Sequence, residues 1–121
     1  MTQLRLRILF GDAMLGPGKA ELLERIRATG SIAAAGRQMD MSYKRAWMLV
    51  EELNTAFRDP LVASVRGGPG GGGAHLTEAG DKVLQLYHDI VETSMSASAA
   101  QIAVLERMLR ASAQGDIPDG R

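Results

Sequence analysis

The stretch GSIAAAGRQMDMSYKRAWMLVEELN at residues 30–54 decides the fold that we predict for this chain of 121 residues. Apolar residues recur at helical spacing in both halves of the stretch, and the first half is too short to be stable as an isolated helix. Ser31 and Ser42 each stand where a serine oxygen can cap a following helix. The stretch therefore predicts two helices joined by residues 39–41, MDM.

The second of these helices has one continuous apolar face. Its members are Ala46, Leu49, Val50, Leu53 and Phe57. Packing this face inward leaves Lys44, Arg45 and Met48 projecting outward near the start of the helix. Two short helices with a tight connection predict a helix-turn-helix, whose second helix enters the DNA major groove by its N-terminal end.

The flanking segments complete the predicted fold. Residues 4–10 alternate as in a half-buried strand, residues 11–18 are a turn-rich connection, and a helix follows that stops at Gly30. After the helix-turn-helix, residues 61–66 predict a strand, and residues 74–76 can return as its partner across a glycine-rich tip. We expect a mainly α fold with a small β-sheet, a winged helix-turn-helix.

Thr77 can cap a long last helix, in which small residues at 94–100 permit a bend or break. Its apolar stripe is wide for an exposed helix, so we expect a second copy of the chain to cover it. The expected dimer interface is Val83, Tyr87, Ile90, Ile102 and Leu105. Within one domain, residues 1–76 are the expected DNA-binding part, 77–113 the helical dimerisation segment, and 114–121 a frayed tail.

Composition narrows the functional classes. The chain has no cysteine, which excludes disulfides, thiolate nucleophiles and cysteine metal sites, and no apolar run spans a bilayer, so we expect a cytoplasmic protein without a membrane partner. The net charge is zero, but residues 1–76 hold ten Lys and Arg against seven Asp and Glu, a net of +3. Residues 77–121 carry a net of −3, so the N-terminal half is the one that favours anions.

Several residues at the start of the second helix are suited to DNA. Either Lys44 or Arg45 can recognise guanine, and a good bidentate contact discriminates by about 1–3 kcal/mol. Trp47 lies on the flank of the apolar stripe, and we favour core packing for it over base or sugar contact. The expected recognition-helix contacts are Ser42, Tyr43, Lys44, Arg45 and Met48.

The glycine-rich tip has three interpretations: a flexible linker, a nucleotide phosphate loop, or a wing over the DNA minor groove. A phosphate loop needs a following Lys-Ser/Thr pair that this sequence lacks, and the strand-like flanks favour the wing. Because the tip itself carries no Lys or Arg, its backbone N–H groups are the main expected donors. The expected wing contacts are Arg66, Gly67, Gly68, Gly70, Gly71, Gly72 and Gly73.

Residues 30–54, followed by GGPGGGGAHLTEAG at 67–80, resemble the N-terminal DNA-binding domain of molybdate-dependent (ModE-type) transcription regulators, relatives of the LysR-type winged helices. The resemblance covers about residues 5–95 and implies that residues 42–45 contact DNA, that residues 66–74 form the wing, and that the long last helix contributes to dimerisation. Regulators of this type hold molybdate in C-terminal domains for which this chain leaves no room. We therefore expect a stand-alone module without a cofactor, unless a separate sensor protein is a partner.

The leading hypothesis is a transcription regulator that binds double-stranded DNA as a homodimer on an inverted repeat. The alternative is a winged-helix protein-interaction module without specific DNA binding, motivated by the near-neutral charge and by Glu51 and Glu52 on the outer side of the recognition helix. An enzyme is not expected. His88 and Glu92 have the spacing of a helical metal pair, but two ligands are too few, so we assign no catalytic or metal site.

Overall fold

The computed structural model describes residues 2–68 and 71–110, and the side chains of these except at 66–68 and 71–72. The chain forms two compact units, which are described separately. The first contains residues 6–87, and the second contains the start of the chain up to Arg5 together with the residues from His88 onward. All the elements that were predicted to contact DNA lie in the first unit.

A small hairpin opens the first unit. Strand β1 (Ile8–Phe10) pairs antiparallel with β2 (Ala13–Leu15) across a turn at Gly11, where φ is 66°. The predicted strand over residues 4–10 is therefore paired only in its last three residues, and the predicted connection at 11–18 contains a strand. Strand β2 was not predicted, because three residues are too few for a period of two to show in the sequence.

Three helices follow, as predicted: α1 (Pro17–Thr29), α2 (Ile32–Gln38) and α3 (Tyr43–Ala56). Helix α1 ends at Gly30, which has the left-handed φ of 72° that suits glycine at this position. Both predicted serine caps are confirmed. The Ser31 hydroxyl oxygen accepts from the N–H of Ala34 at 3.0 Å, and that of Ser42 accepts from the N–H of Arg45 at 3.1 Å.

Helices α2 and α3 approach each other closely at Gly36. A Cβ built on Gly36 would lie 3.0 Å from the Cβ of Ala46, and both residues are buried. The sharp connection between the helices also contains Asp40 at a φ of 57°. A small residue on each helix thus sets their spacing, and the face of α3 opposite Ala46 is left free to face solvent.

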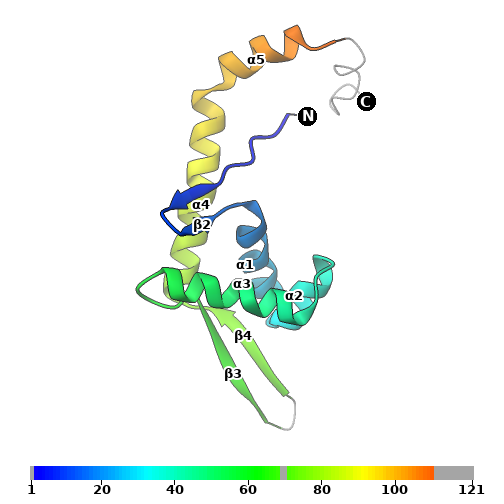
Figure 1. Cartoon of the computed structure of the whole chain (residues 1–121), viewed down its shortest axis with the longest axis vertical. Helices are drawn as coiled ribbons and strands as arrows, with labels where there is room; N and C mark the ends of the chain where they lie inside the picture. The colour runs from blue at the N-terminus through cyan, green and yellow to red at the C-terminus, as the bar shows by residue number, and fades with distance from the viewer. Residues whose placement is uncertain (1, 69–70, 111–121) are drawn as a thin grey trace. The chain divides into compact units, whose positions relative to one another are not determined.

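The predicted wing is confirmed as the hairpin of β3 (Val62–Gly68) and β4 (Gly71–Leu76), which extends away from the helices in Figure 1. Its base is tied to the helices through Asn54. The amide Nδ2 donates to the carbonyl of Val62 at 3.0 Å, and Oδ1 accepts from the N–H groups of Leu61 and Val62 at 2.8 and 3.1 Å. On the other strand, Ala74 N–H donates to the carbonyl of Gly30 at 2.9 Å.

The last predicted helix is divided in two: α4 (Glu78–Ala97) and α5 (Ala99–Met108), with the break at Ser98 inside the small-residue stretch. Thr77 caps α4 as predicted, its hydroxyl oxygen accepting from the N–H of Gly80 at 3.0 Å. Gly80 is needed for packing, because a Cβ there would overlap the carbonyl oxygen of Leu61. No helix among residues 2–68 and 71–110 is long and apolar enough to span a bilayer.

The core of the first unit lies where α1, α3, the base of the wing and the first half of α4 meet. Its largest fully buried side chains are Leu22, Leu23, Ile26, Leu53, Leu61 and Leu84. Every one of these is aliphatic, so the elements that carry the predicted DNA contacts are fixed by packing and not by surface charge.

Candidate nucleic-acid interface

The N-terminal turns of α3 present an exposed face. Ala46, Leu49 and Val50 are buried, whereas the side chains of Lys44, Arg45 and Met48 are exposed. Tyr43 is 58% exposed and Met48 is 42% exposed. The structure therefore brings the five predicted recognition-helix residues together on one accessible surface, headed by the capping hydroxyl of Ser42.

Trp47 corrects one expectation. It was predicted to pack in the core, yet 44% of its surface is exposed. The helical wheel places Trp47 at the edge of the apolar stripe, and no other element covers that edge fully. An exposed tryptophan on the candidate interface is a large flat surface that the sequence interpretation assigned to the core.

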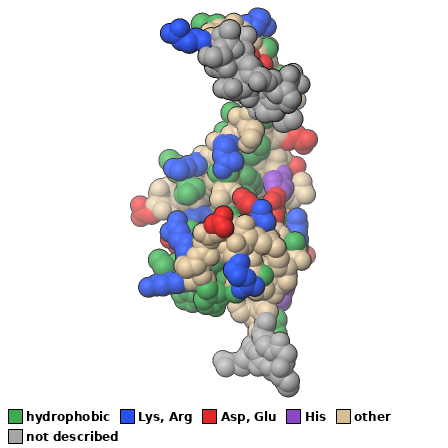
Figure 2. All heavy atoms as spheres, turned by 90° about the vertical axis from the view of Figure 1, so that its right-hand side faces the viewer, with side chains coloured by type: hydrophobic (Ala, Val, Ile, Leu, Met, Phe, Trp, Pro, Cys, Tyr) green, Lys and Arg blue, Asp and Glu red, His purple; other side chains and the backbone are tan. Residues whose placement is uncertain are grey.

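Lys44 and Arg45 form no salt bridge with any described residue. By contrast, Arg25 binds Glu21 at 2.7 Å and Arg27 binds Asp81 at 3.3 Å. On the face drawn in Figure 2, basic side chains lie among acidic ones. The two charges on α3 can therefore bind an anionic partner without breaking an ion pair, and what sets them apart from Arg7, Arg37, Arg58 and Lys82 is their place at the exposed start of α3.

The wing residues are placed in part. Arg66, Gly67 and Gly68 belong to β3, and Gly71, Gly72 and Gly73 belong to β4, with a shift in the strand register between Val65 and Gly68. Gly70 lies outside the described residues. Gly73 sits close to the helices, because a Cβ there would lie 3.0 Å from the carbonyl oxygen of Gly30. This close approach brings the wing base to the turn before α2.

A helix-turn-helix with a β-hairpin wing matches a known family. Residues 18–81, from the start of α1 to the start of α4, match the bacterial regulatory helix-turn-helix proteins of the lysR family. The chain belongs to this family.

Relatives agree with this assignment. The chain is 42% identical over 85 residues to the transcriptional regulator ModE of Yersinia pestis, covering 70% of this chain and 30% of that protein. It is 44% identical over 75 residues to the molybdenum-pterin-binding protein MopB of Rhodobacter capsulatus, covering 62% and 28%. It is also 37% identical over 89 residues to the DNA-binding transcriptional dual regulator ModE of Escherichia coli K12, covering 74% and 32%.

These matches confirm the predicted resemblance to ModE-type winged helices. The chain spans about 30% of the length of these relatives. Family and relatives together support a DNA-binding transcription regulator.

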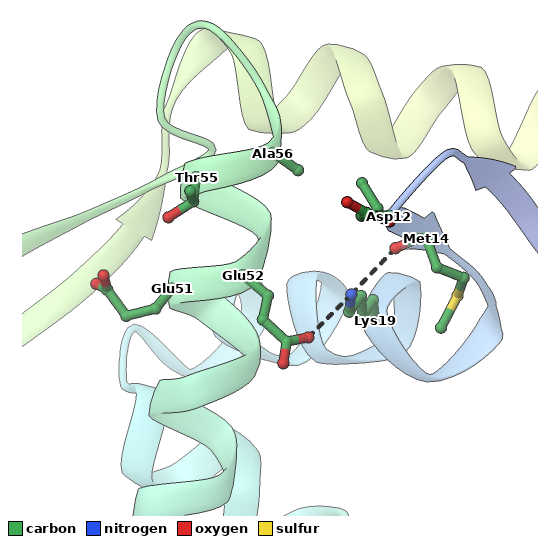
Figure 3. A pocket seen from close by; sticks show the side chains of 8 residues that line it. Asp12, Met14, Lys19, Glu51, Glu52, Thr55 and Ala56 are labelled. Carbon is green, nitrogen blue, oxygen red and sulfur yellow. Dashed lines mark hydrogen bonds and ion pairs between the residues drawn. The ribbon is translucent and has the colours of Figure 1, made fainter.

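A hollow with a volume of about 680 Å³ lies between β2, α1 and the C-terminal half of α3. Figure 3 shows Lys19 and Glu52 pointing toward each other across it. The Lys19 ammonium donates to the Met14 carbonyl at 3.1 Å and pairs with Glu52 at 3.1 Å, while the Lys19 side chain is only 10% exposed. Glu52 is thus paired within the domain although its side chain is 52% exposed, whereas the exposed Glu51 has no salt bridge with any described residue.

The residues that were predicted to form a dimer interface fall into two groups. Tyr87 is only 4% exposed, and its hydroxyl donates to the carbonyl of Leu6 at 2.6 Å, so it belongs to the interior of one copy and has little surface for a partner. Val83 and Ile102 are half-buried, whereas Ile90 is 42% and Leu105 is 61% exposed. None of the residues of α5 is buried.

Among the described residues no group of three or more His, Asp or Glu side chains is arranged to hold a metal ion. His88 and Glu92, the pair considered in the sequence, are both exposed on α4. The site that the structure supports is therefore the exposed surface of α3 and the wing.

Proposed function

We propose that this chain binds double-stranded DNA sequence-specifically, as a homodimer on an inverted repeat, and regulates transcription. The observation that carries the proposal is the exposed, capped N-terminal end of α3 with two cations that have no salt bridge to any described residue. Such an end inserts into the major groove, where side chains contact base edges. Lys44, Arg45 and Met48 are the proposed base contacts.

The wing supplies the second set of proposed contacts. The proposed donors to phosphate are the backbone N–H groups of the six glycines at 67, 68 and 70–73, and Arg66 is the proposed cationic contact. Hydrogen bonds from the base of the wing to Asn54 and to Gly30 hold the wing against the helices. They support a constant distance between the wing and the recognition helix.

The proposed dimer contact lies on α5 and the end of α4. Apolar residues in this unit are exposed in a single copy: Ile90 at 42%, Val104 at 45%, Leu105 at 61% and Met108 at 75%. Leaving such a helix in water is unfavourable, at about 25 cal/mol for each Å² of apolar surface. A second copy is the proposed cover because a two-fold pair of recognition helices matches an inverted repeat.

The proposal includes no catalysis, cofactor or metal, since the family is one of regulators. The cytoplasm is the proposed location, because a bacterial transcription regulator acts on the chromosome. A separate sensor protein as a partner stays a prediction.

Selection of binding sequences from a random DNA pool at near-physiological salt tests the proposal. We expect an inverted-repeat motif, bound by the unaltered chain and lost by the Lys44→Ala, Arg45→Ala double variant. The control is Arg58→Ala with Lys82→Ala, which removes two exposed cations from outside the first turns of α3 and retains the motif. Equal enrichment by both double variants would reject α3 as the recognition helix.

A protein-interaction module is the second candidate. The exposed apolar surfaces of Trp47 and Met48, together with the exposed Glu51, favour it because such surfaces suit a protein partner as well as DNA. Weak and sequence-independent DNA binding at modest salt, with no motif after selection, would support this candidate over the first.

A further inference from the structure

A groove lies between the start of α3 and the wing, apart from the outward face that carries Lys44 and Arg45. Its volume is about 300 Å³. The lining combines the first turns of α2 and α3 with both strands of the wing: Ser31, Ile32, Ala33, Tyr43, Ser64, Val65, Gly73 and Ala74. None of these lining residues carries a charge.

The groove has hydroxyl donors that are not used within the fold. In the part of the chain that the structure describes, the side-chain hydroxyls of Tyr43 and Ser64 have no hydrogen-bond partner. Both side chains are exposed, Tyr43 at 58%. They are therefore able to donate to an external acceptor at no cost to a bond inside the protein.

Apolar surface stands beside these hydroxyls. Val65 on β3 is 55% exposed, and Trp47, at 44%, follows Tyr43 by one helical turn on the same flank of α3. Asn54 lies farther along this flank and bonds to the base of β3, which shows that the flank faces the wing. The groove thus has hydroxyl donors beside the apolar side chain of Val65, with Trp47 on the adjoining flank of α3 and without a cation among its lining residues.

The geometry of the duplex identifies what fits this groove. Major and minor grooves are about 12 and 6 Å wide and are separated by one sugar–phosphate strand. If α3 enters the major groove and the wing reaches the neighbouring minor groove, that strand must pass between α3 and the wing. A deoxyribose-phosphate chain offers the anionic acceptors and apolar sugar faces that hydroxyls and aromatic rings bind.

We propose that this groove binds one sugar–phosphate strand of the DNA duplex, with the Tyr43 and Ser64 hydroxyls donating to phosphate and with Trp47 and Val65 against deoxyribose. The inference rests on the proposed function. It assigns Tyr43 to the sugar–phosphate backbone of the DNA and not to a base, so the contribution of Tyr43 to affinity does not depend on the DNA sequence. Because neutral donors release no counterions from DNA, the hydroxyl contacts of the groove do not add to the salt dependence of binding.

Trp47 provides a direct test, since it is the one tryptophan of the sequence. We expect binding of the selected DNA to protect its fluorescence from acrylamide quenching. Random duplex DNA at saturating concentration should give the same protection, because every duplex has the same backbone. Full quenching of Trp47 fluorescence in the bound state would show that the DNA strand lies elsewhere, and the groove proposal would then be wrong.

Affinity measurements on Tyr43→Phe and Ser64→Ala form the second test. Each variant removes a hydroxyl and should weaken binding to selected and random DNA equally, by about threefold to tenfold, which is the usual range for one neutral hydrogen bond. The slope of log affinity against log salt should stay as in the unaltered chain. Lys44→Ala, at a proposed base contact, should instead weaken binding to the selected sequence more than binding to random DNA.

The matched control is Thr55→Ala, which removes an exposed hydroxyl from the same helix about 18 Å beyond Tyr43 and should leave affinity unchanged. If Lys44→Ala weakens binding but Tyr43→Phe and Ser64→Ala do not, the groove is wrong and the proposed function stands. If the unaltered chain binds no DNA, the proposed function fails and the groove fails with it.

Discussion

Asn54→Ala removes the side chain that joins the end of α3 to the base of the wing. Three hydrogen bonds are lost, at 2.8, 3.0 and 3.1 Å, all to backbone groups of Leu61 and Val62. At about 0.5–1.5 kcal/mol for each bond, the loss is about 1.5–4.5 kcal/mol. Alanine returns about 0.5 kcal/mol through its higher helix propensity. We therefore expect a net destabilisation of about 2 kcal/mol, which corresponds to a fall in Tm of about 10 °C for a unit of this size.

Urea and thermal unfolding followed by circular dichroism measure this change. The control is Thr55→Ala, the next residue along the helix, which is exposed and has no hydrogen-bond partner in the described part of the chain, so its stability should stay within about 0.5 kcal/mol of the unaltered chain. Because the Leu61 and Val62 residues themselves are buried, water cannot fully replace the lost bonds. A destabilisation by Asn54→Ala no larger than that of Thr55→Ala would refute the view that Asn54 anchors the wing.

Three further variants test other parts of the structure. Gly80→Ala should destabilise by about 1–3 kcal/mol in thermal unfolding, although alanine favours helix, because its Cβ overlaps the Leu61 carbonyl; an unchanged Tm would contradict this packing. Leu105→Lys on α5 should yield a folded monomer in sedimentation equilibrium, and a dimer of unchanged affinity would remove α5 from the interface. Ser42→Ala should lower the free energy of unfolding by about 1 kcal/mol, because the helix cap is lost. Ser42→Asp should restore stability but not DNA affinity, since it adds a negative charge at the interface. Full recovery of DNA affinity by Ser42→Asp would place Ser42 away from phosphate.

Features set by local chemistry could be predicted from the sequence. Ser31, Ser42 and Thr77 cap their helices as predicted, because a serine or threonine oxygen bonds to N–H groups within three residues of it. The end of α1 at Gly30 and the glycine-rich hairpin follow from backbone preferences in the same way. These short-range signals sufficed to place the predicted recognition helix and the wing.

Features set by tertiary packing could not be predicted in this way. The exposure of Trp47 and the burial of Tyr87 depend on which element covers each edge of a helix, and a helical wheel does not contain that information. Asn54 gave no signal in the sequence, because its partners at Leu61 and Val62 are separated from it by a loop whose path only the structure reveals. The bonding pattern of Asn and Asp near turns is the one clue that would have suggested it.

The ties between helices and wing bear on how such a domain can change its DNA sequence preference. Strand β3 is joined to α3 through Asn54, and β4 is joined to the turn before α2 through the bond from Ala74 N–H to the Gly30 carbonyl. Thr77 N–H adds a third tie, to the Leu61 carbonyl at 2.9 Å. All three involve backbone groups or a residue off the outward face, so substitutions at Lys44 or Arg45 leave the distance from α3 to the wing unchanged. The proposed neutral groove, with its width fixed in this way, would hold the DNA strand in one position. The outward residues of α3 would determine which bases are preferred. The base preference could then change without a change in the position of the DNA strand.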